Sequence, residues 1–124
     1  MAMSPDQPPD ILERLEDYAV EAIGLFRYLQ EQSDRAGWDL GRQFLRAATS
    51  IGVNVEEAQA ASSRKDFIYK YSIAQREARE CRFFLRLFIR VDLAPEEQLR
   101  PLLQEANELY AIITTIIKNK KRIR

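Results

Sequence analysis

The chain has 124 residues, which is enough for one domain with a core of its own but not for several domains. Its composition, 46% hydrophobic and 31% charged, is typical of a folded globular protein and excludes a mostly disordered chain. The 19 basic and 19 acidic residues cancel, and the absence of histidine removes the commonest general base and metal ligand.

Several features bear on the cellular compartment. Cys81 is the only cysteine, so it has no partner for an internal disulfide. The N-terminal residues MAMSPDQPPD lack the basic start and apolar run of a signal peptide. No stretch approaches the roughly 18 apolar residues needed to span a bilayer. The simplest interpretation is a cytoplasmic protein of bacterial type.

The zero net charge is divided unevenly along the chain. Residues 1–60 contain 5 basic and 11 acidic side chains, whereas residues 61–124 contain 14 basic and 8 acidic ones. Such asymmetry indicates self-association or a basic surface that faces an anionic partner. Pairing of opposite charges within one domain would also explain it.

Helical spacing of apolar residues starts after a proline-rich segment. Residues 1–9 are expected to be a flexible lead-in, and Asp10 with Glu13 forms a capping box for a helix over about 10–32. Residues 33–37 are predicted to be a turn. A second helix is expected from Trp38 or Asp39 to about Ala60, and Gly52 within it suggests close contact with a neighbouring helix.

The stretch SIGVNVEEAQAASSRKDF joins this second helix to a third. Ser63 and Asp66 form a capping box, so the third helix is expected over about 64–93, with a core face that reaches Val91. A fourth helix opens after Pro95. Pro101 predicts either a kink in it or a main helix that begins at about residue 100.

Four amphipathic helices with short connections predict an all-α fold, an up-down-up-down antiparallel four-helix bundle. Residues 10–121 are expected to form the single domain, followed by a basic tail over 122–124. No strand pattern competes with this assignment.

Motifs for catalysis and cofactor binding are absent from the sequence. There is no glycine-rich phosphate loop, no CxxC and no HExxH, and without histidine no ordinary catalytic triad forms. We therefore expect no catalytic residues, no cofactor and no metal. A remote alternative is an all-carboxylate metal site formed by Glu56, Glu57, Glu77 and Glu80. The least favoured hypothesis for the function is an enzyme or small-ligand binder centred on Glu57, Glu77 and Glu80.

Polar residues on the inner sides of the second and third helices are more informative. Asn54 lies on the core side of its helix, and Glu77 projects with core aromatics, so it needs a partner. Arg46 is the nearest candidate by facing geometry. The predicted network comprises Arg46, Ser50, Asn54, Glu57, Ser63, Asp66, Glu77 and Glu80. It would fix helix register, contact a second subunit, or bind a ligand or partner.

A stripe of basic residues marks the third helix. At 100° per residue it occupies an arc of about 120°, opposite much of the core face, and Phe83 lies inside the arc. An arginine stripe with an aromatic ring suits phosphates and stacked bases. A solvated face, or ion pairs with acids of the first helix or of another subunit, are the alternatives. The stripe comprises Arg76, Arg79, Arg82, Arg86 and Arg90.

The segment 46–80 also carries three groups of residues at recognisable spacing. The first is Arg46, Ser50, Ile51, Asn54, Val55 and Glu57; the second is Ser63, Asp66 and Phe67; the third is Ile73, Ala74 and Glu80. Together they resemble the 23S rRNA intervening-sequence proteins. Two positions depart from that pattern, since Ala58 replaces a glycine and Glu77 replaces a small residue.

This resemblance implies a cytosolic four-helix bundle that forms a ring-shaped homopentamer. Such proteins are encoded within or near insertions in 23S rRNA genes. The first hypothesis is therefore a non-enzymatic homo-oligomer that engages rRNA or a ribonucleoprotein through the stripe. The second is a protein–protein interaction scaffold without nucleic-acid binding. Neither hypothesis involves a membrane or a small-molecule substrate.

Overall fold

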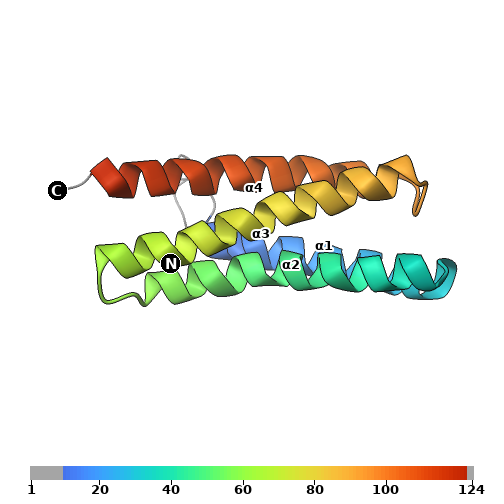
Figure 1. Cartoon of the computed structure of the whole chain (residues 1–124), viewed down its shortest axis with the longest axis horizontal. Helices are drawn as coiled ribbons and strands as arrows, with labels where there is room; N and C mark the ends of the chain where they lie inside the picture. Colours follow the sequence, from blue (N-terminus) through green and yellow to red (C-terminus); the bar gives the residue numbers. More distant parts are fainter. Residues whose placement is uncertain (1–9, 123–124) are drawn as a thin grey trace.

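The structure is a computed structural model, and it describes residues 10–122. Four helices follow one another: α1 (Ile11–Gln32), α2 (Arg35–Gln59), α3 (Arg64–Arg90) and α4 (Glu96–Arg122). Each runs antiparallel to the one before it, so the predicted up-down-up-down four-helix bundle is confirmed (Figure 1). No strand occurs within residues 10–122.

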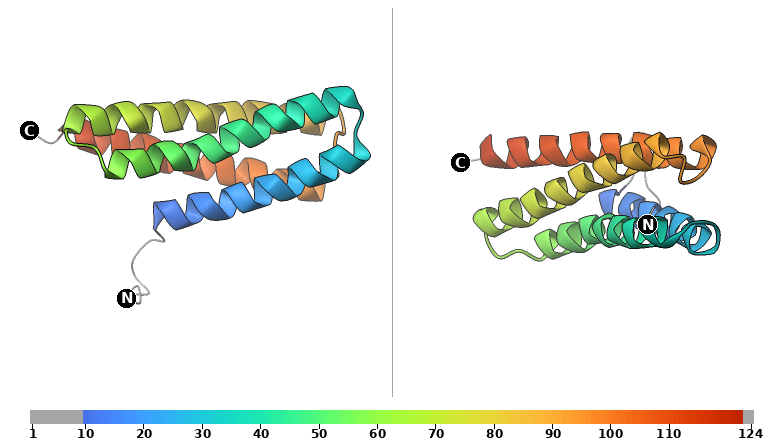
Figure 2. Two further views of the ribbon diagram at one scale, coloured as in Figure 1. Left: turned by 90° about the horizontal axis from the view of Figure 1, so that it is seen from below. Right: turned by 45° about the vertical axis from the view of Figure 1, so that its right-hand side comes forward.

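The helices form two layers, α1 beside α2 and α3 beside α4 (Figure 2). Consecutive helices pack along their length, whereas α1 and α4 approach each other at few backbone positions. Side chains bridge that wider seam. The Arg14 guanidinium donates to Glu105 Oε2 at 2.6 Å and to Glu108 Oε1 at 2.7 Å. The buried Tyr18 hydroxyl donates to the Leu102 carbonyl at 3.0 Å.

The core consists of one cluster of side chains drawn from all four helices. Small residues on α2 and α3 let the helices approach, and aromatic rings fill the wider spaces. The Phe44 and Phe88 rings meet edge to face at 6.0 Å between centroids. Val91, expected in the core, is 56% exposed because α3 ends one residue before it.

Side-chain caps begin α1 and α3 as the sequence predicts. The Asp10 carboxylate accepts from the Leu12 amide at 3.2 Å, and the Ser63 hydroxyl accepts from the Asp66 amide at 3.0 Å. Each cap satisfies one of the amides that the first turn of a helix leaves without a partner.

The beginning of α2 differs from the prediction. It starts at Arg35, before the expected Trp38 or Asp39, because the Asp34 side chain accepts from the Gly37 amide at 3.0 Å and acts as the cap. The predicted turn over 33–37 is therefore mostly helix, and only Ser33 and Asp34 connect α1 to α2.

The end of α3 also comes earlier than expected, at Arg90 rather than Leu93. Asp92 adopts a left-handed conformation with φ 53°. The Asp92 amide then donates to Ile89 O at 3.2 Å, and the Leu93 amide donates to Phe88 O at 3.0 Å. These two bonds form a Schellman motif, which satisfies carbonyls at the helix end and reverses the chain.

Pro101 does not delay the start of α4. The helix is continuous from Glu96, so the alternative of a start at about residue 100 is wrong. Proline cannot donate to the carbonyl four residues back, which belongs to Glu97. Both Glu97 and Pro101 are exposed, so water can reach that part of the helix.

The expected lead-in over 1–9 and the last two residues of the expected basic tail lie outside the described residues. Arg122, which was assigned to that tail, is the final residue of α4.

The tightest glycine contacts occur at Gly37 and Gly41, not at the expected Gly52. A Cβ added to Gly52 would lie 3.5 Å from Leu15 Cβ, which is ordinary contact. A Cβ added to Gly37 would lie 2.6 Å from Ser33 Cβ and 2.8 Å from Leu93 Cδ1. The short connection between α1 and α2 therefore requires Gly37, whereas the bundle has room for a methyl group at Gly52.

We predict opposite effects for alanine at these two positions. Gly52→Ala should raise the free energy of unfolding by about 0.5–1 kcal/mol, because alanine loses less backbone entropy in a helix. Gly37→Ala should lower it by about 1–3 kcal/mol through overpacking. Urea titration followed by circular dichroism measures both values. Equal effects at the two sites would contradict this packing.

Candidate functional site

An ion-pair cluster connects the middle of α2 to α3. Arg46 Nη1 donates to Glu77 Oε2 at 3.1 Å, and Arg46 Nη2 donates to Glu80 Oε1 at 2.9 Å. Glu77 is 6% exposed, and among the described residues it is the one buried charged side chain. Hydrogen bonding to Glu77 raises the pKa of the Arg46 guanidinium. The structure thus brings together three members of the predicted polar network.

The other members of that network lie apart from this cluster. Asn54 Nδ2 donates to the Ser50 carbonyl at 2.8 Å, one turn back on its own helix. Glu57 Oε1 accepts from Lys70 Nζ at 2.7 Å. Ser63 and Asp66 form only the α3 cap. The predicted network is therefore two ion-pair clusters, a bond within α2 and a helix cap.

The candidate carboxylates for a metal or ligand site do not converge on one position. Glu77 and Glu80 bind Arg46, and Glu57 binds Lys70. Within residues 10–122, no group of three or more His, Cys, Asp or Glu side chains is placed to hold a metal ion.

The arginine stripe divides into two parts. Arg76, Arg79, Arg86 and Arg90 are exposed, whereas Arg82 is half-buried. The Arg82 guanidinium lies over the Tyr110 ring of α4, 4.8 Å from its centroid, and its buried Nε has no hydrogen-bond partner among the described residues. A cation over an aromatic face is attracted by the ring quadrupole. Arg82 therefore belongs to the α3–α4 contact.

A second polar contact sets the rotation of α3 against α4. Gln75 Nε2 donates to the Thr114 hydroxyl at 2.9 Å. On α3, Gln75 and Arg82 flank the outward arc on the α4 side, and Glu77 and Glu80 flank it on the α2 side. The contacts that Tyr110 and Thr114 make with α3 were not predicted. Helical periodicity identifies the buried face of a helix but not the residue that lies opposite it.

Two aromatic side chains are exposed on the outward arc of α3. Tyr69 is 61% exposed and Phe83 is 57% exposed. Phe83 lies among the exposed arginines, as predicted from the helical wheel.

The four exposed arginines are unpaired within the described part of the chain. Five other cations there form ion pairs: Arg14, Arg35, Arg46, Lys70 and Arg100. We define the outward face of α3 as Arg76, Arg79, Phe83, Arg86 and Arg90. It presents four charges that form no ion pair with another described residue, together with an aromatic ring that is 57% exposed.

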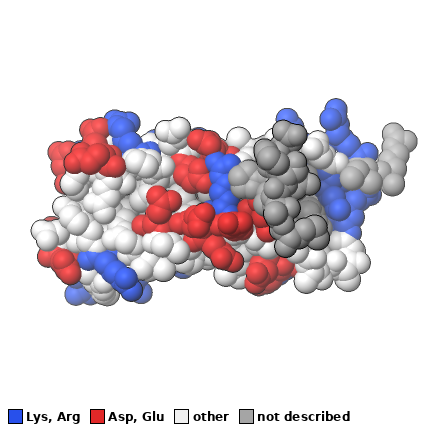
Figure 3. Space-filling view, turned by 180° about the vertical axis from the view of Figure 1, so that it is seen from behind, with Lys and Arg blue, Asp and Glu red and all other residues white. Residues whose placement is uncertain are grey.

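The opposite side of the molecule is acidic. Figure 3 shows carboxylates gathered along the middle of the reverse face, where α1 lies in front. Exposed acids of α1 point away from the core there, and Glu105 and Glu108 of α4 hold Arg14 at the seam. The exposed acids of α1 are Glu13, Glu16, Asp17, Glu21 and Glu31. The uneven charge along the sequence thus becomes a charge separation across the bundle.

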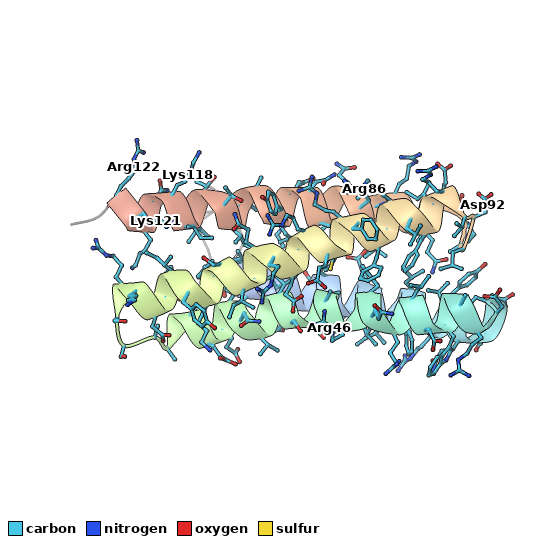
Figure 4. All side chains as sticks on the ribbon, in the orientation of Figure 1. Arg46, Arg86, Asp92, Lys118, Lys121 and Arg122 are labelled. Carbon is cyan, nitrogen blue, oxygen red and sulfur yellow. The ribbon has the colours of Figure 1, made fainter. Side chains whose placement is uncertain are left out.

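A separate basic cluster occupies one end of the bundle, where α4 finishes. Lys118, Lys121 and Arg122 are exposed there, at a distance along the bundle from Arg86 (Figure 4). Lys120 Nζ lies over the Phe67 ring at 4.5 Å from its centroid. Lys120, Arg64 and Phe67 border an open hollow of about 650 Å³ beside the α2–α3 loop. Sequence reasoning assigned no role to this hollow.

Three buried titratable groups with raised pKa values lie in the core behind these surfaces. Burial raises the pKa of the Tyr18 and Tyr71 phenols and of the Cys81 thiol above their ordinary values. Cys81 is fully buried and behaves as a small apolar side chain.

Comparison with known proteins identifies relatives of this four-helix bundle. A family model described as 23S rRNA-intervening sequence protein matches residues 10–115. The chain belongs to this family. A crystal structure of a family relative agrees with the fold: a protein of unknown function from the S23 ribosomal protein family of Bacteroides thetaiotaomicron. It is 33% identical, its TM-score is 0.82, and the match covers 88% of this chain and 99% of that one.

Among curated proteins, none matches this chain. None of the four helices described over residues 10–122 has an apolar stretch long enough to cross a membrane.

The two departures from the family pattern occupy different environments. Ala58 is buried at the end of α2, where its methyl group joins the core. Glu77 is buried as the partner of Arg46. In this chain the acid at position 77 therefore links α3 to α2.

We predict that removing the Arg46 charge destabilises the bundle. Arg46→Met should lower the free energy of unfolding by about 1–3 kcal/mol, because buried Glu77 loses its partner. In a Glu77→Gln background the same change should cost markedly less, since no buried charge is left unpaired. Urea titration of the four proteins of this double-mutant cycle measures both costs. Equal costs in the two backgrounds would contradict the coupling.

We also predict alkaline destabilisation. The raised pKa values mean that the unfolded chain loses these protons first as pH rises, so folding stability falls above the ordinary values of 9.0 for Cys81 and 10.0 for Tyr18 and Tyr71. The slope should reach about 1.4 kcal/mol per pH unit for each group.

Thermal melts from neutral to alkaline pH test this dependence. Cys81→Ala and Tyr18→Phe should each flatten the fall in melting temperature, whereas Tyr69→Phe on the surface should leave it unchanged. An unchanged slope in the two core variants would show that other groups cause the destabilisation.

Proposed function

We propose that the protein is a non-enzymatic cytoplasmic homo-oligomer, pentameric as the family resemblance implies, that engages RNA or a ribonucleoprotein through the outward face of α3. The observation that carries this proposal is the set of four exposed arginines without carboxylate partners among the described residues. An unpaired basic row attracts an anionic partner.

The spacing of the row suits a phosphate backbone. Arg76 to Arg90 span about 21 Å along the helix axis at 1.5 Å per residue. Guanidinium groups match phosphate oxygens in a two-pronged geometry. Each phosphate that an arginine neutralises releases condensed counterions, which supplies affinity at low salt and removes it at high salt.

The comparisons agree with an RNA-related role without identifying one. The matching family is named for an intervening sequence of 23S rRNA, and the relative from Bacteroides thetaiotaomicron is assigned to a ribosomal protein family and has unknown function. In this chain, the surface that suits an anionic partner such as RNA is the outward face of α3.

The ion pairs of the candidate carboxylates support a non-enzymatic role. Glu57, Glu77 and Glu80, which an acid–base or metal-assisted reaction would use, are each held by Lys70 or Arg46. These ion pairs occupy the carboxylate oxygens, and the sequence has no histidine to replace them as a general base.

The second candidate is a protein–protein interaction scaffold, and the acidic reverse face favours it (Figure 3). The outward face of α3 in one subunit would then pair with the acids of α1 in the next. Such a contact joins different surfaces of the two copies, and it closes into a ring when the rotation between subunits allows. In this case the arginines would have no phosphate to bind.

A double variant distinguishes the two candidates. RNA binding predicts that Arg79→Gln/Arg86→Gln weakens affinity for a 23S rRNA fragment. It should also reduce the slope of log affinity against log salt by about 2, because two phosphate contacts are lost. Fluorescence anisotropy at several salt concentrations measures the slope, and light scattering measures the oligomer mass.

Arg35→Gln/Arg100→Gln is the matched control. It removes the same number of exposed positive charges from α2 and α4, each of which pairs with an acid on its own helix. The control should keep the wild-type slope. If the α3 variant instead dissociates the oligomer and wild-type protein ignores RNA, the scaffold function replaces the proposed one.

A further inference from the structure

We propose that the outward face of α3 binds unpaired bases, with Phe83 as the platform on which one base stacks. The inference rests on the proposed RNA binding and narrows it to single-stranded segments, such as the loops and bulges of a folded RNA. It follows from the exposure, surroundings and support of one aromatic ring.

Phe83 presents an apolar ring to solvent in the middle of a charged row. Its side chain is 57% exposed, although the half-buried Phe84 beside it shows that the helix has a place for an aromatic ring against the bundle. A ring in this position offers a flat surface to a partner. Every nucleobase has a matching flat surface, whatever its sequence.

Cations flank the ring on both sides along the helix. Arg79 lies four residues before Phe83 and Arg86 three residues after it, so both are its surface neighbours on α3. Both arginines are exposed and make no ion pair within the described residues. A base stacked on Phe83 would therefore have a guanidinium within reach of the phosphate on either side.

The ring is held from behind by other aromatic side chains. Phe83 meets Phe84 edge to face, with centroids 6.0 Å apart and planes at 69°. Phe84 in turn stacks on the buried Phe88 at 6.2 Å. These ring contacts restrict the motion of the Phe83 side chain before a ligand binds. Binding therefore costs less side-chain conformational entropy.

The combination of an exposed aromatic ring and flanking arginines favours binding of unpaired over paired nucleic acid. In an RNA duplex the bases are stacked on each other, and proteins bind mainly phosphates and 2′-hydroxyls. The arginines would contact a duplex as well as a single strand, but Phe83 would contribute nothing to a duplex. Only an unpaired base can use both the ring and its flanking charges.

Tyr69 supplies a matched comparison on the same helix. It is similarly exposed, at 61%, but Lys70 Nζ already lies 5.9 Å from its ring centroid. Four residues back it has the cation Lys65, but three residues on it has Ser72, where Phe83 has Arg86. An exposed ring alone is therefore not expected to bind RNA.

The test measures affinity for three probes of equal length: single-stranded oligoadenylate, an abasic oligomer and a blunt RNA duplex. Wild-type protein should bind oligoadenylate most tightly. Phe83→Ala should weaken oligoadenylate binding by about 5- to 150-fold and leave the other two affinities unchanged. Phe83→Trp should retain binding, and Tyr69→Ala should match wild type. Circular dichroism and light scattering check that each variant keeps its fold and mass.

The outcomes separate this inference from the function on which it rests. If Phe83→Ala binds oligoadenylate as tightly as wild type, or if the duplex binds best, base stacking is wrong while RNA binding stands. If wild-type protein binds none of the probes at low salt, both are wrong. A loss of oligomer mass in Phe83→Ala would place the ring in a subunit contact and also overturn the inference.

Discussion

The pairing of Arg46 with the buried Glu77 is the interaction on which the orientation of α3 depends. A carboxylate that is 6% exposed needs a cationic partner, so α3 can rotate little about its axis without leaving a buried charge unpaired. On the other side, Arg82 over Tyr110 and Gln75 on Thr114 hold α3 against α4. These contacts fix which arc of α3 faces outward.

Basic residues consequently serve two different purposes in this bundle. Some hold helices together, as Arg14 does by bridging α1 to the acids of α4. Others, on the outward face of α3, have no acid to hold within the described chain. Because the acids of α1 gather on the reverse face, the two signs of charge are separated across the molecule (Figure 3). That separation suits either an anionic partner or a second copy of the chain, and the exposed Phe83 favours RNA.

The fold and the outward arc were predictable from the sequence because both depend on local periodicity. Four apolar stripes gave the bundle, and the Ser63 cap located the start of α3. Helix ends were less predictable, because they depend on single contacts such as the Asp34 cap and the left-handed Asp92. Most contacts between residues of different helices could not be predicted from the sequence. Arg82 was grouped with the exposed arginines because a helical wheel takes no account of Tyr110 on the neighbouring helix.

The central claim is that the outward face of α3 is open in the assembled protein and becomes covered by RNA. Its most direct test is thiol labelling of an Arg79→Cys variant, because the natural Cys81 is buried and has a raised pKa. Labelling should be as fast as that of an exposed Lys118→Cys variant, and it should slow when single-stranded RNA is added. Protection of position 79 without RNA would mean that another subunit covers this face, and RNA could not then bind there.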